Sequence, residues 1–243
     1  MAPQWIRLSA ILFLLLVYST PPVYTVEKQI LFREEFLSVD HWKPLYFPKI
    51  KLHTTYAVKS DGGEQYLRAE SKASASALVY KDEFNVYKYP KAGWRWRVDR
   101  LTLKGNPHAK SGDDYAIRVY FMFRYDPEKA TFFEKIQYGL AKKLYGEYPP
   151  HCTLSYVWSY AETATTIYDS PYTDKAKIIV LRNGTSSLGE WMVEERNILE
   201  DYRRVFGKDP PSAAGIALMA DSDNTGGEAV ASVDFIEVYR DVP

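Results

Sequence analysis

The fold is constrained most by the stretch from Asp114 to Arg124, where large apolar or aromatic side chains occupy every second position. Period-two alternation of this kind is typical of a half-buried antiparallel strand. Gly93–Val98 repeats the pattern, because Trp94, Trp96 and Val98 alternate with two arginines. We expect both stretches to be strands that bury one face. In the longer stretch, one predicted face is Tyr115, Ile117, Val119, Phe121 and Phe123, and the other is Ala116, Arg118, Tyr120, Met122 and Arg124.

Similar segments recur along most of the chain, and Gly, Pro, Asn and Asp separate them. This pattern predicts an all-β fold, an antiparallel two-sheet sandwich of jelly-roll, concanavalin-like type with two short helical insertions. A closed barrel is the alternative. The further predicted strands are Gln29–Phe36, Lys51–Val58, Glu64–Glu70, Ser74–Tyr80, Cys152–Trp158, Ala176–Arg182, Trp191–Arg196, Ala214–Met219 and Val230–Tyr239.

Two segments have helical spacing instead. The first is Pro127–Tyr145, which Asp126 caps and Gly146 ends. It is interpreted as a structural flap, a lid over a groove or a membrane-contacting element. The second is Ile198–Phe206, where Asn197 is the expected N-cap and Gly207 the exit.

The N-terminal segment predicts export. Leu8–Val17 is uncharged and apolar, follows Arg7 and is followed by Ser19, as in a secretory signal peptide. A buried helix or an uncleaved anchor is the alternative interpretation. We therefore divide the chain into a signal peptide at 1–19, a linker at 20–28 and a single β-sandwich domain at 29–240. An exported location, periplasmic or extracellular, follows, with membrane contact only through the signal segment.

Composition narrows the function classes. The chain has 31 Lys+Arg and 31 Asp+Glu, so no net charge attracts nucleic acid, and none is expected as a partner. The mean hydropathy of −0.34 excludes a polytopic membrane protein. Cys152 is the single cysteine, which excludes an intrachain disulfide framework and a multi-cysteine metal site.

An ordered set of segments resembles a known bacterial family. The set comprises GWRWRV (93–98), SGDDYAIRVY (111–120), LSYVW (154–158), SPY (170–172), IVLRNG (179–184), EERNILEDYRRVFG (194–207) and DSDNTG (221–226). Over roughly residues 31–239 the chain resembles the exported family called domain of unknown function 3047. The resemblance implies a mostly β fold and a bacterial envelope setting, and it supplies no catalytic residues. The Pro127–Tyr145 helix departs from the family pattern and looks like an elaboration of this chain.

The turn from Asp221 to Gly226 is the candidate metal site. Carboxylates two residues apart with further oxygens nearby suit a hard cation such as Ca²⁺, with Asp221, Asp223 and Asn224 as ligands. The EF-hand pattern fails later, because Ser232 stands where a bidentate Glu belongs. An Asx-rich turn that bonds backbone N–H groups is the alternative.

Adjacent acidic pairs raise two further possibilities. Asp113 and Asp114 are expected to bind a cation, hold Arg118 or cap a turn. Glu194 and Glu195 point to opposite faces of a strand, so they do not flank one glycosidic bond. We expect one of them to pair with an arginine in a structural ion pair.

Aromatic and guanidinium side chains on central segments are the candidate ligand site. Sugars stack on aromatic rings, and arginine pairs bidentately with carboxylates such as those of uronic acids. Packing within the sheets is the alternative interpretation. The predicted ligand-binding residues are Arg118, Tyr120, Tyr156, Trp158, Arg182 and Glu195.

These features lead to competing functional hypotheses. The first is an exported module that binds carbohydrate or an envelope polymer. The alternative is a polysaccharide-active enzyme, a lyase or hydrolase, which requires Arg118, Tyr156, Arg182 and Glu195 to converge in one open cleft. A structural envelope protein is the third. No catalytic residue is assigned, and calcium is the one cofactor considered.

Overall fold

The computed structural model describes residues 27–128, 149–161 and 166–242. The predicted signal peptide and nearly all of the linker lie outside these residues, as does the predicted first helix from residue 129 onwards. Within the described part, no helix has the length and apolar character needed to cross a bilayer.

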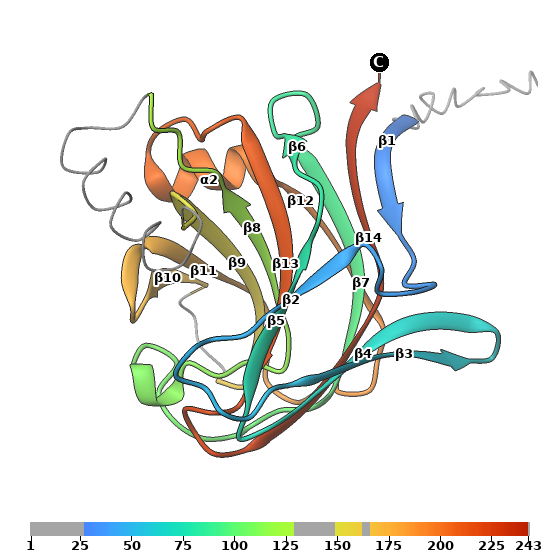
Figure 1. The fold of residues 1–243 in the computed structure, drawn as a ribbon, viewed down its shortest axis with the longest axis vertical. Helices are drawn as coiled ribbons and strands as arrows, with labels where there is room; N and C mark the ends of the chain where they lie inside the picture. Colours follow the sequence, from blue (N-terminus) through green and yellow to red (C-terminus); the bar gives the residue numbers. More distant parts are fainter. Residues whose placement is uncertain (1–26, 129–148, 162–165, 243) are drawn as a thin grey trace, which may run out of the picture.

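Two sheets pack face to face (Figure 1). The first, sheet A, has the order β12-β7-β14-β4-β3, and β1 also pairs with β14. It consists of β1 (Glu27–Glu34), β3 (Thr55–Asp61), β4 (Glu64–Lys72), β7 (Lys91–Arg100), β12 (Met192–Asn197) and β14 (Glu228–Val242).

Sheet B has the order β10-β11-β9-β8-β13-β5-β2, and β6 also pairs with β13. The chain passes repeatedly between the sheets, and both sheets keep free edges, so the sandwich prediction is confirmed and the described part forms no closed barrel. Sheet B consists of β2 (Trp42–Leu45), β5 (Ala75–Tyr80), β6 (Phe84–Asn85), β8 (Arg118–Phe123), β9 (Cys152–Ser159), β10 (Ile167–Ser170), β11 (Thr173–Asn183) and β13 (Ala213–Asp221).

One strand pair departs from the predicted antiparallel arrangement. β9 and β11 run parallel, with Tyr156 opposite Ile179. β10 then pairs antiparallel with β11 at the sheet edge. The prediction missed β10, and it also missed β2 and the two-residue β6. β2 contains Pro44, a residue that sheets tolerate at edges, and β2 is the edge strand at the other end of sheet B.

The core lies between the two sheets and is rich in aromatic rings. Trp94 and Trp96 of β7 are fully buried, whereas Arg95 and Arg97 of the same strand lie on the outer face, as the alternation predicts. The ring of Trp94 lies 5.2 Å from that of Tyr156 and 6.3 Å from that of Phe121. Such pairs each contribute about 0.5–1.5 kcal/mol beyond the area they bury.

The strand predicted at Asp114–Arg124 begins later than expected, at Arg118. From there the alternation is correct, because Val119, Phe121 and Phe123 face the core. The assignment of Tyr115 to that face is wrong. Tyr115 packs on the opposite side of sheet B, with Val157 and Ile178. The assignment of Ala116 to the outer face is wrong too, because Ala116 belongs to the main core.

The predicted second helix is confirmed as α2 (Ile198–Phe206). The side chain of Asn197 accepts a 3.1 Å hydrogen bond from the backbone N–H of Glu200. Gly207 ends the helix with φ of 65°, in the left-handed region that suits glycine. The amide of Gly207 donates to the carbonyl of Arg203, which satisfies a terminal acceptor.

Candidate functional site

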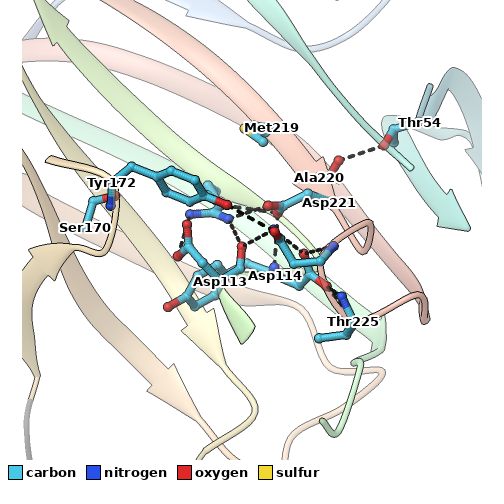
Figure 2. A network of polar contacts seen from close by, with 12 residues as sticks. Thr54, Asp113, Asp114, Ser170, Tyr172, Met219, Ala220, Asp221 and Thr225 are labelled. Atoms are coloured by element: carbon cyan, nitrogen blue, oxygen red, sulfur yellow. Dashed lines mark hydrogen bonds and ion pairs between the residues drawn. The ribbon is translucent and has the colours of Figure 1, made fainter. Parts of the chain in front are cut away.

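A buried arginine, Arg118, lies at the start of β8 between two aspartates. Figure 2 shows these two aspartates, Asp113 and Asp221, within a network of polar contacts. Arg118 is 3% exposed. Its Nη1 donates to Asp113 Oδ1 at 3.2 Å, and its Nε donates to Asp221 Oδ1 at 3.2 Å. A second bond joins Nη2 to Asp221 Oδ2, so the guanidinium holds Asp221 in a bidentate pair. This geometry offsets the cost of burying the charges. It confirms for Asp113 the expectation that an acidic residue at 113–114 holds Arg118.

The neighbouring Asp114 ties this loop to the turn after β13. Its carboxylate accepts from the backbone N–H of Asn224 at 3.2 Å and from that of Thr225 at 2.8 Å. The hydroxyl of Thr225 donates to it as well, at 2.5 Å. These bonds give the predicted calcium turn an internal acceptor for its backbone N–H groups.

Three carboxylates of this cluster lie close enough to share a cation. Oxygen atoms of Asp114, Asp221 and Asp223 are all within 4.8 Å of one another. The structure therefore brings two of the three predicted metal ligands together with Asp114. The third, Asn224, uses its amide differently: Nδ2 donates to Asp114 at 3.1 Å, and Oδ1 accepts from the hydroxyl of Tyr172 at 3.0 Å. Figure 2 shows Tyr172 reaching the cluster from the turn between β10 and β11.

The cluster holds more negative than positive charge. Burial raises the pKa of Asp221 to about 7, against the opposing effect of Arg118. Burial also raises the pKa values of Asp113 and Asp223. Within the described part of the chain, Asp223 forms no ion pair. The cluster thus contains four aspartates, of which Asp113 and Asp221 contact the one guanidinium, and a bound cation or a proton stabilises such an excess of carboxylates.

The predicted ligand groove is not formed. Tyr156 and Trp158 are fully buried between the sheets, and their outward neighbours on β9 are Ser155 and Val157. The reason is the register between β8 and β9. Tyr156 lies opposite the core residue Val119, and Ser155 lies opposite Tyr120, so the aromatic residues of β9 share the inner face. The groove prediction is therefore wrong for Tyr156 and Trp158.

The remaining predicted ligand residues lie on different surfaces. Tyr120 is half-buried on the outer side of sheet B, where its hydroxyl lies 3.9 Å from the sulfur of Met219. Arg182 of β11 pairs with Glu194 of β12 at 2.7 Å, which confirms a structural ion pair for one of the two glutamates and links the sheets. Glu195 points the other way and pairs with Lys28.

The enzyme hypothesis needed one cleft that combines Arg118, Tyr156, Arg182 and Glu195. The fold separates them: Arg118 is sealed among aspartates, Tyr156 is in the core, Arg182 bridges the sheets, and Glu195 is on the outer face of sheet A. The prediction that these four residues converge in one cleft is therefore wrong.

Glu195 does line an open pocket, of about 820 Å³, at the end of sheet A. Here β7 begins, β14 ends and β12 leads into α2, near the C-terminus marked in Figure 1. Tyr87, from the loop before β7, lines it with a side chain that is 42% exposed. The volume is in the range of small-ligand sites. The charged lining residues are Lys88, Lys91, Glu195, Arg196, Glu200, Arg240 and Asp241.

A chain of hydrogen bonds connects this pocket to the core. The hydroxyl of Tyr156 donates to Asp201 Oδ2 at 2.7 Å. Both oxygens of Asp201 accept from Arg196, at 2.8 and 2.7 Å, and Arg204 donates to Oδ1 at 2.8 Å. Tyr156 thus orients a wall of the pocket although it does not line it.

Sequence reasoning missed most of this pocket. Tyr87, Lys88 and Arg240 come from a loop and a strand end that meet through long-range pairing, such as that of Tyr239 with Lys91. The available signal was modest: YKYPK at 87–91 places aromatic and cationic residues directly before a buried strand.

Comparison with known families gives one match, to the family described as Protein of unknown function (DUF3047), over residues 40–237. The chain belongs to this family. This match confirms the resemblance drawn from the ordered segments of the sequence. No curated protein matches the sequence.

Several solved structures are similar in fold. A family 11 carbohydrate-binding module from Clostridium thermocellum, in complex with a mixed-linked tetrasaccharide, is 10% identical; 88% of this chain and 96% of that one align, with a TM-score of 0.40. A cellulase derived from Cel12A of Rhodothermus marinus is 10% identical, with 78% and 88% aligned and a TM-score of 0.40. A lectin from Bauhinia forficata in complex with GalNAc is 8% identical, with 89% and 100% aligned and a TM-score of 0.37. These similarities concern the sandwich architecture alone.

Proposed function

We propose that this DUF3047 protein is an exported, non-catalytic module that binds carbohydrate or a related envelope polymer. The observation that carries the proposal is the open pocket of about 820 Å³ beside Glu195. At this pocket, Glu195, a predicted ligand residue, lies together with the exposed aromatic ring of Tyr87 around a cavity of ligand size.

The chemistry of the lining suits a saccharide. Sugar hydroxyls both donate and accept hydrogen bonds, and the pocket offers carboxylates as acceptors beside ammonium and guanidinium donors. The half-exposed ring of Tyr87 supplies an apolar surface for the C–H face of a sugar. Most of the polar groups are held by pairing, such as Glu195 with Lys28 and Arg196 with Asp201, which limits the entropy lost on binding.

Binding is favoured over catalysis because two of the three pocket carboxylates are engaged in ion pairs. Glu195 pairs with Lys28, and Asp241 pairs with Lys91. A lyase or hydrolase of the predicted kind needs Arg118 and Tyr156 beside the substrate, and both are buried elsewhere. The pocket geometry therefore supports a ligand held by polar contacts and a ring.

Export to the periplasm or beyond is part of the proposal and depends on the Leu8–Val17 segment. Cell fractionation of the full chain, with Leu12→Arg as the altered form, tests it. We expect the unaltered chain outside the cytoplasm with its N-terminus cleaved, and the variant retained with its leader. Cytoplasmic accumulation of the unaltered chain would contradict export.

A second proposal concerns calcium. We propose that Asp114, Asp221 and Asp223 bind Ca²⁺ and stabilise the turn at 221–226. The excess of carboxylates around Arg118, with the raised pKa values of Asp221 and Asp223, supports it. Such a site would be structural and separate from the Glu195 pocket. Asp221 is at the end of β13 that lies away from α2, whereas Glu200 of α2 lines the pocket.

A glycan-array screen of the purified chain tests the binding function. We expect retention of at least one glycan class, and a loss of affinity of about five- to tenfold for Tyr87→Ala and for Glu195→Gln. Matched controls are Tyr46→Ala, an exposed tyrosine, and Glu64→Gln, an exposed glutamate, neither of which lines the pocket. No retained glycan, or equal losses in the controls, would count against the proposal.

A further inference from the structure

We infer that the ligand of the Glu195 pocket carries negative charge, as in a polysaccharide that contains uronic acid. This inference rests on the proposed carbohydrate binding and names its substrate class. The reason lies in which charged groups of the pocket are already neutralised and which are not.

Four charged lining groups, Lys91, Glu195, Arg196 and Asp241, have partners of opposite charge. Glu195 pairs with Lys28, and Asp241 pairs with Lys91. Arg196 donates from Nε and Nη2 to the two oxygens of Asp201, which also accepts from Arg204. These pairs reduce the field of the four lining groups, because each of the four has a group of opposite charge at contact distance.

Two cations of the lining have no carboxylate partner among the described residues. Arg240 donates from Nε to Gln29 Oε1 at 2.6 Å, so its partner is a neutral amide. Its guanidinium also lies 5.7 Å from the ring centre of Tyr89, the residue after Lys88. Lys88 is exposed and forms no ion pair within the described ranges. Both cations line the same pocket.

Among the described residues, Glu200 is the one lining carboxylate that has no ion-pair partner, compared with two such cations. The uncompensated charge of the lining is therefore positive. A guanidinium whose other donors are unused suits a carboxylate, which it binds bidentately. A sugar carboxylate at Arg240, with hydroxyls toward Glu200 and Glu195, would match the lining group by group. The net charge of the whole chain is zero, so the preference for an anion is local to this pocket.

Calorimetric titration with matched oligosaccharides tests the inference. The probes are hexasaccharides from polygalacturonate, alginate and hyaluronate, each compared with the same hexasaccharide after its carboxylates are reduced to alcohols. In 20 mM salt we expect at least one acidic form to bind about tenfold more tightly than its reduced form. The preference should shrink at 300 mM salt, since exposed charges are screened.

Variants separate the charge from the pocket itself. Arg240→Gln and Lys88→Gln are each expected to lower the affinity for the acidic form about five- to tenfold. The affinity for the reduced form should fall by less, because a hydroxyl loses only a hydrogen-bond donor and no opposite charge. Lys59→Gln, which removes an exposed lysine of β3 outside the pocket, is the matched control. Both pocket cations are on the surface, so thermal unfolding should remain at the wild-type temperature.

The possible outcomes are distinguishable. Reduced forms that bind as tightly as acidic forms would overturn the inference about charge and leave carbohydrate binding in place. Failure of every acidic and reduced probe, together with an empty glycan array, would overturn both. An acidic preference that Arg240→Gln and Lys88→Gln leave unchanged would place the acid site elsewhere and overturn the assignment to this pocket.

Discussion

The hydroxyl of Tyr156 donates a 2.7 Å hydrogen bond to Asp201, and this bond links the interior of the sandwich to helix α2. Asp201 is only 5% exposed and also accepts from two arginines. A tyrosine that the sequence assigns to a ligand surface thus supports the fold and the wall of a pocket.

The first prediction concerns this bond. Tyr156→Phe should lower the free energy of unfolding by about 1–2 kcal/mol, because a buried acceptor on Asp201 loses one donor. Urea denaturation measures the change, and Tyr46→Phe, an exposed ring, is the control. Unchanged stability combined with lost glycan retention would instead support the original groove.

The second prediction concerns the sealed arginine. Arg118→Met should cost about 3–5 kcal/mol, since it leaves Asp113 and Asp221 buried without their cation. Arg95→Met, which removes a surface arginine paired with Asp234, should cost about 1 kcal/mol or less. Equal effects in chemical denaturation would show that the Arg118 cluster contributes no more than a surface pair.

The third prediction is a pH dependence. The folded pKa of Asp221, about 7, is above the ordinary value of 3.8, so between these values the folded state binds a proton that the unfolded state has released. Stability should therefore fall as pH rises from about 4 to about 7. Urea midpoints at pH 5 and pH 8 should differ in the wild type and differ less in Asp221→Asn. A wild type that becomes steadily more stable toward pH 8 would contradict the proposed linkage.

The fourth prediction concerns calcium. Millimolar Ca²⁺ should raise the unfolding temperature of the wild type and not that of Asp223→Ala, whereas Asp61→Ala, at the exposed last residue of β3, should respond like the wild type. Binding should strengthen as pH rises toward 8, because Asp221 must lose its proton. Flat calorimetric traces for wild type and Asp223→Ala alike would remove the calcium proposal.

The local parts of the fold were predictable because short-range patterns determine them. The alternation of Trp94 with Arg95, and the cap at Asn197, follow from neighbours in the sequence. The link of Asp113 to Arg118 spans five positions and was also within reach.

The ligand surface was less predictable because it depends on register between distant strands. Whether Tyr156 lies beside Val119 or Tyr120 is a shift of one residue, which moves every side chain to the other face. Likewise, Asp114 contacts Thr225 across 111 positions, and the Glu195 pocket combines a loop, the ends of three strands and the start of a helix. No periodic pattern in the sequence predicts such long-range contacts.

The pairing of β1 with β14 places Glu27 directly opposite Val242, so the first and last described strands lie side by side (Figure 1). Antiparallel ladder bonds run perpendicular to the strands. Tension applied at the two ends would therefore load these bonds one after another, like a zipper, instead of all at once in shear. A chain tethered at both ends would yield first along this seam, beside the Glu195 pocket, while the aromatic interior stayed intact.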